Sequence, residues 1–544
     1  MKFKSITSFM AMGVLIAVAS ASCTSSDPAT YKFRDKVENV TYANARNARN
    51  NLYGSGADMT SNGRTLIIPV QFADFMGDDL PSETREVDGG RKDIYNVNFG
   101  EAEDTQWQSL KSYYYKSSYG KTDLTGAVTP WFTPYSESND TPGEPLTAKG
   151  LATEAPGYQG AARVLRQAYS WLDKLAYAQV QKNDGTYYST SAELFKDFDI
   201  DGNGLIDNIQ LVYSCHSLQK DGGGNPIDNT LFWAFRTSTG YKANKNKPVA
   251  SNYLWLSYYT FYENGYYTGN VYHDYTDADI ASGTAKLDAH TLIHETGHAL
   301  GLEDYYTNTN GDISAAGKFL MMDYNIGDHD PFSKAAYGWT NPTVVLDSCE
   351  ISLSKFQETG DSIIIPAKGR WTYGGTTNTL LDEYIMLEYY TPDGLNAFDT
   401  AHNYTGSTAY PKGPTTSGIK VWHIDARLGS FLYSDGSLQF VRYETSLVAV
   451  TNGFTYMANS NNAQDNKSAG LPSSNKLIET MKKNGLPMRS GETFNDDFLW
   501  GQGDTFGVST WQSYAFHSGD KFGYTLEVLS LGDTASIKIT ANAA

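Results

Sequence analysis

Cysteine is scarce in this 544-residue sequence, which has three, at positions 23, 215 and 349. Cys23 belongs to the leading segment described below, so the folded chain keeps Cys215 and Cys349. Two cysteines are too few for a zinc site made of cysteine alone. In an oxidising compartment they could form one disulfide, or they could be two separate structural thiols. The sequence leaves both alternatives open.

Basic residues are also few relative to acidic ones. There are 42 Lys and Arg against 61 Asp and Glu, which gives a formal net charge of −19 at pH 7. Nucleic-acid binding requires a basic surface, so this charge argues against a nucleic-acid partner. Hydrophobic residues make up 40% of the chain, which is typical of a globular protein.

No apolar run in the sequence is long enough to span a membrane, and the longest apolar run lies at the start of the chain. The segment MKFKSITSFMAMGVLIAVASASC has a basic beginning, an apolar stretch and small residues at its end. This pattern predicts an export signal over residues 1–23. Cleavage after Ala21 would give a secreted protein, whereas bacterial lipoprotein processing would leave a lipid on Cys23. We favour the lipoprotein and expect an extracellular or cell-surface protein that is lipid-anchored and monomeric.

The rest of the chain divides into three predicted segments. Residues 24–62 are polar and predict a tether or short pro-segment. Residues 63–343 mix both kinds of element: strands are expected at 65–75, 124–128, 208–215 and 231–235, and helices at 107–119 and 161–178. Residues 344–544 contain short β-rich runs between turns: SIIIPA, EYIMLEYY, GIKVWHID, SLVAVT, YTLEVLS and ASIKIT. The predicted fold class is therefore α+β, a mixed α/β domain followed by an all-β sandwich.

The stretch HETGHALGLEDYY carries the strongest chemical signal. His294 and His298 are one helical turn apart, so both imidazoles project from the same helix face. Glu295 lies beside the first of them. The spacing HExxH predicts two zinc ligands and a general base for a metal-activated water. The alternative is an amphipathic helix with two ordinary histidines.

The continuation of the motif favours the metal site. Gly301 can adopt the left-handed conformation that ends a helix and turns the chain sharply. Such a turn would bring Asp304 back to the metal as a third ligand, with its neighbour Glu303 as the fallback. The full pattern HExxHxxGxxD is expected by chance in fewer than about one chain in a thousand. We therefore predict a zinc site with an open fourth position.

These residues resemble those of a known family. HETGHALGLEDYY followed by MMDYN is similar to the metzincin arrangement of a long zinc motif and a Met-turn. More closely, RTLIIPVQFAD, YYYKSSYGKTDLTGAVTPWF, LMMDYN and DPFSKAAYGWTNP resemble the immune inhibitor A family of secreted bacterial zinc metalloproteases. EYIMLEYY and GIKVWHID resemble its downstream domain. The stretch before residue 63 departs from the family, because it is too short for a large folded propeptide.

The resemblance implies roles for two further residues. Met322 would form the hydrophobic floor beneath the zinc ligands, and Tyr324 would assist the oxyanion or the attacking water through its phenol. A tyrosine that only packs in the core is the competing interpretation. The resemblance also implies a metzincin-like zinc protease domain over residues 63–343.

An acidic loop, DIDGNGLID, precedes the predicted strand at 208–215. Asp199, Asp201 and Asn203 alternate, Gly204 follows, and Leu205 and Asp207 fall at positions seven and nine of a calcium loop. Gln210 stands where an EF-hand has its bidentate glutamate, so the loop is a variant. We predict a structural calcium ion here; the alternative is a turn rich in Asp and Asn.

Two functions follow from these observations. The first is an exported zinc endopeptidase that cleaves proteins or peptides, with Glu295 as general base. The second is a cell-surface lipoprotein that binds a glycan or a protein through its aromatic-rich β domain and carries a structural or vestigial metal site. The intact Glu295 and the open fourth position favour the first.

Overall fold

The computed structural model describes most of the chain after residue 62. The described residues are 28–33, 63–82, 89–138, 141–174, 180, 182, 185–217, 227–228, 230–262, 265–268, 271–307, 314–375, 378–404, 410–434, 437–489, 492–508, 510–511 and 514–542. The predicted export signal lies outside them, so export and lipid attachment at Cys23 stay predictions. No helix in these ranges combines the length and hydropathy that a bilayer crossing requires.

A five-stranded sheet organises the first half of the chain. Its order is β3 (Thr125–Val128), β2 (Arg64–Val70), β6 (Asn208–Tyr213), β8 (Asn252–Ser257) and β7 (Phe235–Ser238). All neighbours pair in parallel except β7, which is the antiparallel edge strand. The parallel strands are apolar and almost fully buried, as expected for a sheet covered on both faces.

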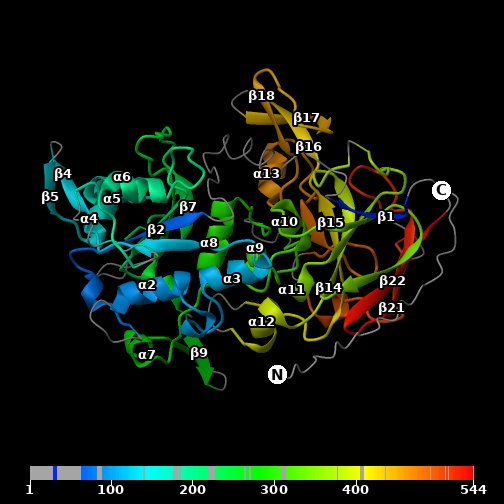
Figure 1. Ribbon diagram of the computed structural model, residues 1–544, viewed down its shortest axis with the longest axis horizontal. Helices are drawn as coiled ribbons and strands as arrows, with labels where there is room; N and C mark the ends of the chain where they lie inside the picture. Colours follow the sequence, from blue (N-terminus) through cyan, green and yellow to red (C-terminus); the bar gives the residue numbers. More distant parts are fainter. Residues whose placement is uncertain are drawn as a thin grey trace, which may run out of the picture.

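Helices cover both faces of this sheet. On one face α4 (Ala148–Glu154), α5 (Tyr158–Leu172) and α6 (Ser191–Asp197) pack against alternate residues such as Leu66, Ile68 and Leu211. On the other face α2 (Gly89–Phe99), α3 (Leu110–Ser117) and α8 (His290–Leu300) pack against Ile67 and Leu254. Figure 1 shows α8 near the middle of the molecule, between this sheet and the β-rich half.

A six-stranded sheet forms the centre of the second half. Its order is β1 (Thr30–Lys32), β11 (Thr343–Val345), β13 (Ser362–Pro366), β14 (Glu383–Tyr390), β15 (Gly418–Asp425) and β19 (Ile478–Thr480). The β1 strand pairs antiparallel with β11. The tether prediction is therefore wrong for residues 30–33, because Tyr31 and Phe33 are buried in this sheet. This strand could not be predicted, since three residues are too few to show a periodicity.

The two faces of the six-stranded sheet bury different partners. Along β14, Met386 faces an apolar cluster that also contains Leu292 and Ile293 of α8, in the first half of the chain. The alternate residues Ile385 and Leu387 face a second cluster, built with a four-stranded sheet. The order of that sheet is β12 (Cys349–Ser354), β22 (Thr534–Ala541), β21 (Tyr524–Ser530) and β20 (Thr505–Gly507). One apolar core thus crosses the predicted boundary at residues 343 and 344.

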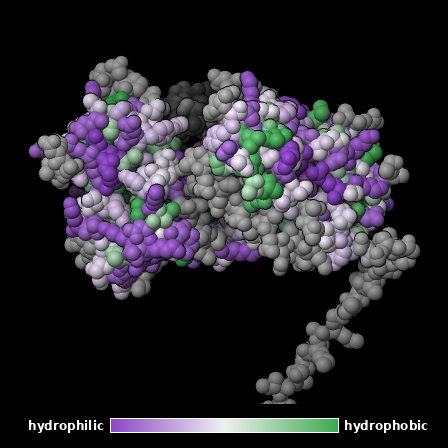
Figure 2. Space-filling model, turned by 90° about the horizontal axis from the view of Figure 1, so that it is seen from above, coloured by the Kyte–Doolittle hydropathy of each residue, from purple (hydrophilic) through white to green (hydrophobic). Residues whose placement is uncertain are grey.

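Smaller elements complete the fold. A three-stranded sheet of β17 (Ser437–Glu444), β16 (Leu428–Ser434) and β18 (Gly453–Met457) projects at the top of Figure 1, beside α13 (Ala463–Ser468). Figure 2, viewed from above, shows a hydrophobic patch on this side of the molecule. Exposed apolar side chains of this sheet and the loop after β17 are Leu432, Val441, Leu447 and Val448.

The remaining elements are the hairpins β4 (Tyr135–Ser138)–β5 (Thr141–Pro145) and β9 (Gly265–Thr268)–β10 (Val271–Asp274), and the helices α7 (Asp277–Ser282), α9 (Met321–Tyr324), α10 (Pro331–Ala336), α11 (Phe356–Thr359) and α12 (Ala397–Ala401).

Several expected elements differ from the structure: the strand expected at 65–75 ends at Val70, and the helix expected at 107–119 spans Leu110–Ser117. The strand predicted at 231–235 begins at Phe235, because Leu231 lies in a turn whose N–H groups bond to Asp228. The run at 446–451 is a loop between β17 and β18, and two of its apolar residues, Leu447 and Val448, are exposed. The helix expected at 161–178 spans Tyr158–Leu172. Apolar content alone does not distinguish a strand from a buried turn or an exposed loop.

The two cysteines are free thiols. Cys215 is buried and Cys349 is half-buried, and neither forms a disulfide. The alternative of two structural thiols is therefore the one that the structure supports.

Candidate metal centre

The helix α8 presents His294 and His298 from one face. Apolar residues, among them Leu292 and Ile293, hold the opposite side of the helix in the core. The rings of His294 and His298 are 4.8 Å apart between centroids and nearly perpendicular. One helical turn of spacing is thus enough to bring two imidazoles to the same place.

Gly301 ends α8 and reverses the chain. Its φ of 99° and ψ of 24° lie in the left-handed region, and its N–H donates to the Gly297 carbonyl at 2.8 Å. The next N–H, from Leu302, donates to the same carbonyl at 2.9 Å. A residue with a Cβ is strained in this conformation, which explains why glycine stands here.

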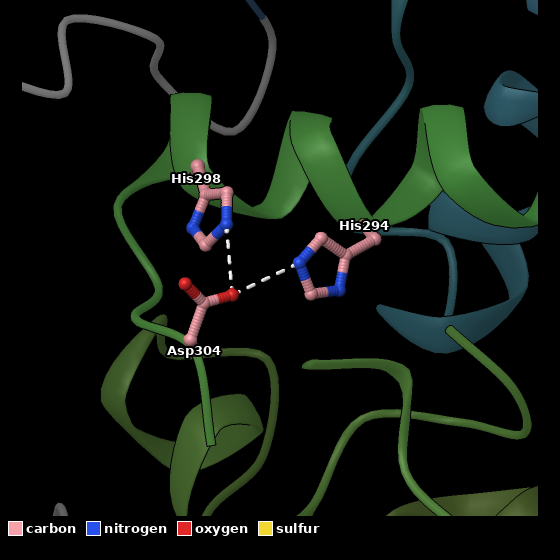
Figure 3. Close-up of side chains that lie close together, drawn as sticks. All are labelled: His294, His298 and Asp304. Atoms are coloured by element: carbon pink, nitrogen blue, oxygen red, sulfur yellow. Dashed lines mark hydrogen bonds and ion pairs between the residues drawn. The ribbon is translucent and has the colours of Figure 1, made fainter. Parts of the chain in front are cut away.

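The turn places Asp304 beside both imidazoles. Asp304 Oδ1 is 3.1 Å from His294 Nε2 and 3.2 Å from His298 Nε2. Figure 3 shows the two rings descending from one helix toward this oxygen, which comes from the chain after the helix. The three ligand atoms lie within 4.8 Å of one another, and among the described residues Glu303 is not part of this group.

The Nδ1 atoms of both rings are hydrogen-bonded to backbone carbonyls. His294 Nδ1 donates to the Met321 carbonyl at 2.9 Å, and His298 Nδ1 donates to the Leu302 carbonyl at 2.8 Å. Since a carbonyl oxygen can only accept, Nδ1 carries the hydrogen in both rings. In the neutral form of each ring, Nε2 then has its lone pair directed at the shared space, as a metal ligand requires.

The electrostatics of the three groups are strongly coupled. Burial alone would raise the pKa of Asp304, but the two imidazoles hold it well below its usual range. Burial likewise opposes a charge on His298, yet Asp304 raises its pKa to about 9. A carboxylate that is ionised at all ordinary pH values is a ready ligand for a cation.

Glu295 and Met322 flank the cluster. Glu295 is half-buried and follows His294 on α8, and its charge contributes to the raised pKa of His298. Met322 is fully buried; a Cβ added to Gly297 would lie 2.4 Å from its sulfur. The methionine therefore packs directly against α8 between the two histidines.

Two tyrosines near the cluster could supply an assisting phenol, and they lie in different surroundings. Tyr324 ends α9, packs with Phe319 and Ile326, and has Lys318 Nζ 5.2 Å above its ring. Its catalytic role stays a prediction. Tyr306, which the sequence did not single out, lies with its ring nearly parallel to that of His294 at 6.3 Å. Burial and then the Asp304 and Glu295 charges raise the pKa of Tyr306. Its position two residues after Asp304 was the available signal.

The acidic loop brings three of its predicted ligands together. Carboxylate oxygens of Asp199, Asp201 and Asp207 lie within 4.8 Å of one another. The Asn203 side chain bonds within the loop instead, since its Oδ1 accepts from Leu205 N at 2.7 Å. Burial raises the pKa of Asp207 to about 7, with smaller contributions from its acidic neighbours. Such a group of carboxylates is unfavourable without a cation among them.

Comparison with known proteins agrees with this geometry. Residues 61–325, just under half of the chain, match the model of the immune inhibitor A peptidase M6 catalytic domain. No curated protein matches the chain. The matched segment contains α8, the turn at Gly301, Asp304 and Met322. Residues 61–325 are therefore an immune inhibitor A peptidase M6 catalytic domain, which places this part of the chain in that family of metallopeptidases.

Proposed function

We propose that this protein is an exported zinc endopeptidase that hydrolyses peptide bonds of extracellular proteins. The observation that carries the proposal is the approach of Asp304 Oδ1 to both Nε2 atoms, at 3.1 and 3.2 Å. Membership of a metallopeptidase family supports the metal and the peptide substrate.

The donor set suits zinc. Metal–nitrogen and metal–oxygen bonds of about 2.0–2.2 Å in a tetrahedral site separate the ligand atoms by about 3.3 Å. The two separations on either side of Asp304 Oδ1 are close to this value. His294, His298 and Asp304 would hold the ion and leave a fourth position for water or substrate. When bound, the metal would supply Lewis acidity to the peptide carbonyl and to the attacking water.

Glu295 would act first as general base and then as general acid. Its carboxylate would take a proton from the attacking water and pass it to the amine nitrogen that leaves. Met322 would keep the base of the site dry and rigid, as in metzincins. The phenols of Tyr306 and Tyr324 are the two candidates for stabilising the developing oxyanion, and the contact of Tyr306 with His294 favours Tyr306.

We also propose that the acidic loop binds calcium in a structural role. Asp199 Oδ1 is buried without a hydrogen-bond partner among the described residues. A buried, unpartnered carboxylate oxygen is costly unless a cation neutralises it. Adding calcium to the chelated protein should therefore raise its melting temperature, and Asp201→Asn should reduce that increase.

The test of peptidase function is Glu295→Gln. We expect this variant to bind as much zinc as the wild-type protein and to cleave unfolded protein substrates about 100- to 10,000-fold more slowly. Elemental analysis and an unbiased peptide-cleavage assay measure the two quantities.

Glu303→Gln is the matched control, because Glu303 is also an acidic residue of the motif but lies outside the ligand cluster. It should keep both zinc and activity. Cleavage by Glu295→Gln at the wild-type rate would remove the proposal. The alternative of a binding lipoprotein with a vestigial metal site gains no support from the family match.

A further inference from the structure

A second cluster of histidines and carboxylates lies at the end of the six-stranded sheet. On β15, Ile419, Val421, His423 and Asp425 alternate along one face. The first two belong to the apolar layer against the four-stranded sheet. At His423 and Asp425 this layer becomes polar, although both residues are buried.

The neighbouring strands continue the polar face. Glu383 of β14 pairs with Asp425, and Glu479 of β19 pairs with His423. The side chains of Glu383, Asp425 and Glu479 are between 0 and 2% exposed. His517, in the loop before β21, reaches the same place from outside the sheet and is 17% exposed.

The two imidazoles meet at one oxygen of Glu383. Glu383 Oε1 is 3.0 Å from His423 Nε2 and 3.9 Å from His517 Nδ1. One ligand atom from each of Glu383, His423 and His517 lies within 4.8 Å of the other two, as in the cluster on α8. Asp425 Oδ2 is 2.9 Å from His517 Nδ1 and helps to orient that ring, while both Asp425 oxygens accept from Arg427.

The far side of the His423 ring is also oriented. His423 Nδ1 is 2.9 Å from Glu479 Oε2, so that nitrogen can donate its hydrogen to a carboxylate. A carboxylate that fixes a histidine while the other nitrogen faces a ligand-binding space is a common arrangement behind metal-bound histidines.

The charges of the cluster call for a divalent cation. Three buried carboxylates face one buried cation, Arg427, which donates two bonds of 2.7 Å to Asp425. Arg489 Nη1, on a half-exposed side chain, lies 3.8 Å from Glu479 Oε1, and the buried group still lacks positive charge if the imidazoles are neutral. Protonating both rings would supply positive charge, but the ring centroids of His423 and His517 are 4.6 Å apart and the two charges would repel. One divalent ion between neutral rings supplies the same charge without this repulsion.

We propose that Glu383, His423 and His517 form a second, structural divalent-metal site of the imidazole–carboxylate class, which zinc fits best. The ion links the loop containing His517 to β14 and β15. It thereby stabilises the polar end of the layer between the six-stranded and four-stranded sheets.

The experiment counts zinc in purified full-length protein by elemental analysis. The variants are His294→Ala, His517→Ala and their combination, and His216→Ala is the control because that histidine is half-exposed and outside both clusters. We expect two zinc ions per chain in the wild type and the control, one in each single variant and none in the combination.

A separate readout does not depend on the folding of any variant. Cobalt added to chelated wild-type protein should give visible absorption bands that saturate at two equivalents. Chelation should also lower the melting temperature of the wild type more than that of His517→Ala.

The outcomes distinguish this proposal from the proposed peptidase function. Wild-type protein with a single zinc that is lost in His294→Ala, or with a second zinc that persists in His517→Ala, overturns the second site. A single zinc lost in His517→Ala but kept in His294→Ala supports the second site and contradicts the peptidase site. Cobalt bands that saturate at one equivalent in the wild type and are unchanged in His517→Ala would identify the cluster as a metal-free ion-pair network.

Discussion

Buried histidines in this protein differ in what their ring nitrogens face. Those of His294 and His298 face carbonyl and carboxylate oxygens. His329 is 1% exposed, is surrounded by Tyr114 and Trp339, and has no hydrogen-bond partner among the described residues at either nitrogen. Burial lowers the pKa of His329 to about 3. This histidine is therefore neutral in the folded protein over the whole physiological range.

The first prediction concerns acid stability and His329. Its folded pKa lies below the unfolded value of about 6.5, so its contribution to stability is fully present above pH 6.5 and is lost as pH falls toward 3. Between pH 6 and pH 4 this residue alone should cost up to about 1.4 kcal/mol of unfolding free energy per pH unit. His329→Phe should remove that dependence.

Denaturant unfolding of metal-free wild type and His329→Phe at pH 7, 6, 5 and 4 measures the effect. The stability difference between the two proteins should shift in favour of the variant as pH falls. Parallel pH curves for the two proteins would contradict the assignment of a buried neutral imidazole.

At the scale of elements, the metal centre is a helix end and the turn that follows it. The α8 helix positions His294 and His298, and the turn at Gly301 positions Asp304. The helix α7 ends in the same way at Gly283, with a φ of 72°, but lies outside the ligand cluster. Gly283 is therefore an internal control for the conformational effect of substituting Gly301.

We expect Gly301→Ala and Gly283→Ala to destabilise the protein similarly, by about 1 kcal/mol, because each forces an L-residue into the left-handed region. Only Gly301→Ala should also weaken zinc binding, since it displaces Asp304. Thermal unfolding of the chelated proteins and zinc competition with a chromophoric chelator measure the two effects. Equal zinc affinity in the two variants would show that Asp304 is not held by this turn.

At the scale of the molecule, the six-stranded sheet joins the two halves of the chain. One face packs with α8 through Met386, and the other packs with the four-stranded sheet through Ile385. Residues 30–32, far away in sequence, supply its edge strand. The position of α8 therefore depends on strands that lie more than 80 residues after it in the sequence.

The edge strand gives a prediction at this scale. Phe33 is 4% exposed, packs on Trp371 at 6.2 Å between ring centroids, and its N–H donates to the Pro342 carbonyl. Phe33→Ala should lower the unfolding free energy by about 3 kcal/mol. Lys32→Ala, at the adjacent half-exposed position, should change it by less than about 0.5 kcal/mol.

Denaturant unfolding of both variants measures these values. Similar small effects in both would mean that residues 30–33 contribute little to the sheet. A large effect confined to Phe33 would also mean that trimming the chain through residue 62 removes a stabilising strand.

Local spacing in the sequence determined which residues meet at the candidate metal centre. The repeat of His294 and His298 depends on one helical turn, and the reach of Asp304 depends on a glycine that only local backbone geometry requires. The mixed sheet, the β-rich second half and the carboxylates of the acidic loop were likewise predictable, because each follows from short-range periodicity or turn chemistry.

Tertiary structure decided what no local pattern contains. Pairing of β1 with β11, the single core shared by both halves, and the meeting of Glu383, His423 and His517 all join residues that are distant in sequence. Strand register brings such residues together, and register depends on which faces become buried when the sheets pack. The alternation in GIKVWHID indicated two faces, but only the packed sheets determined that one of them ends in a cluster of charges.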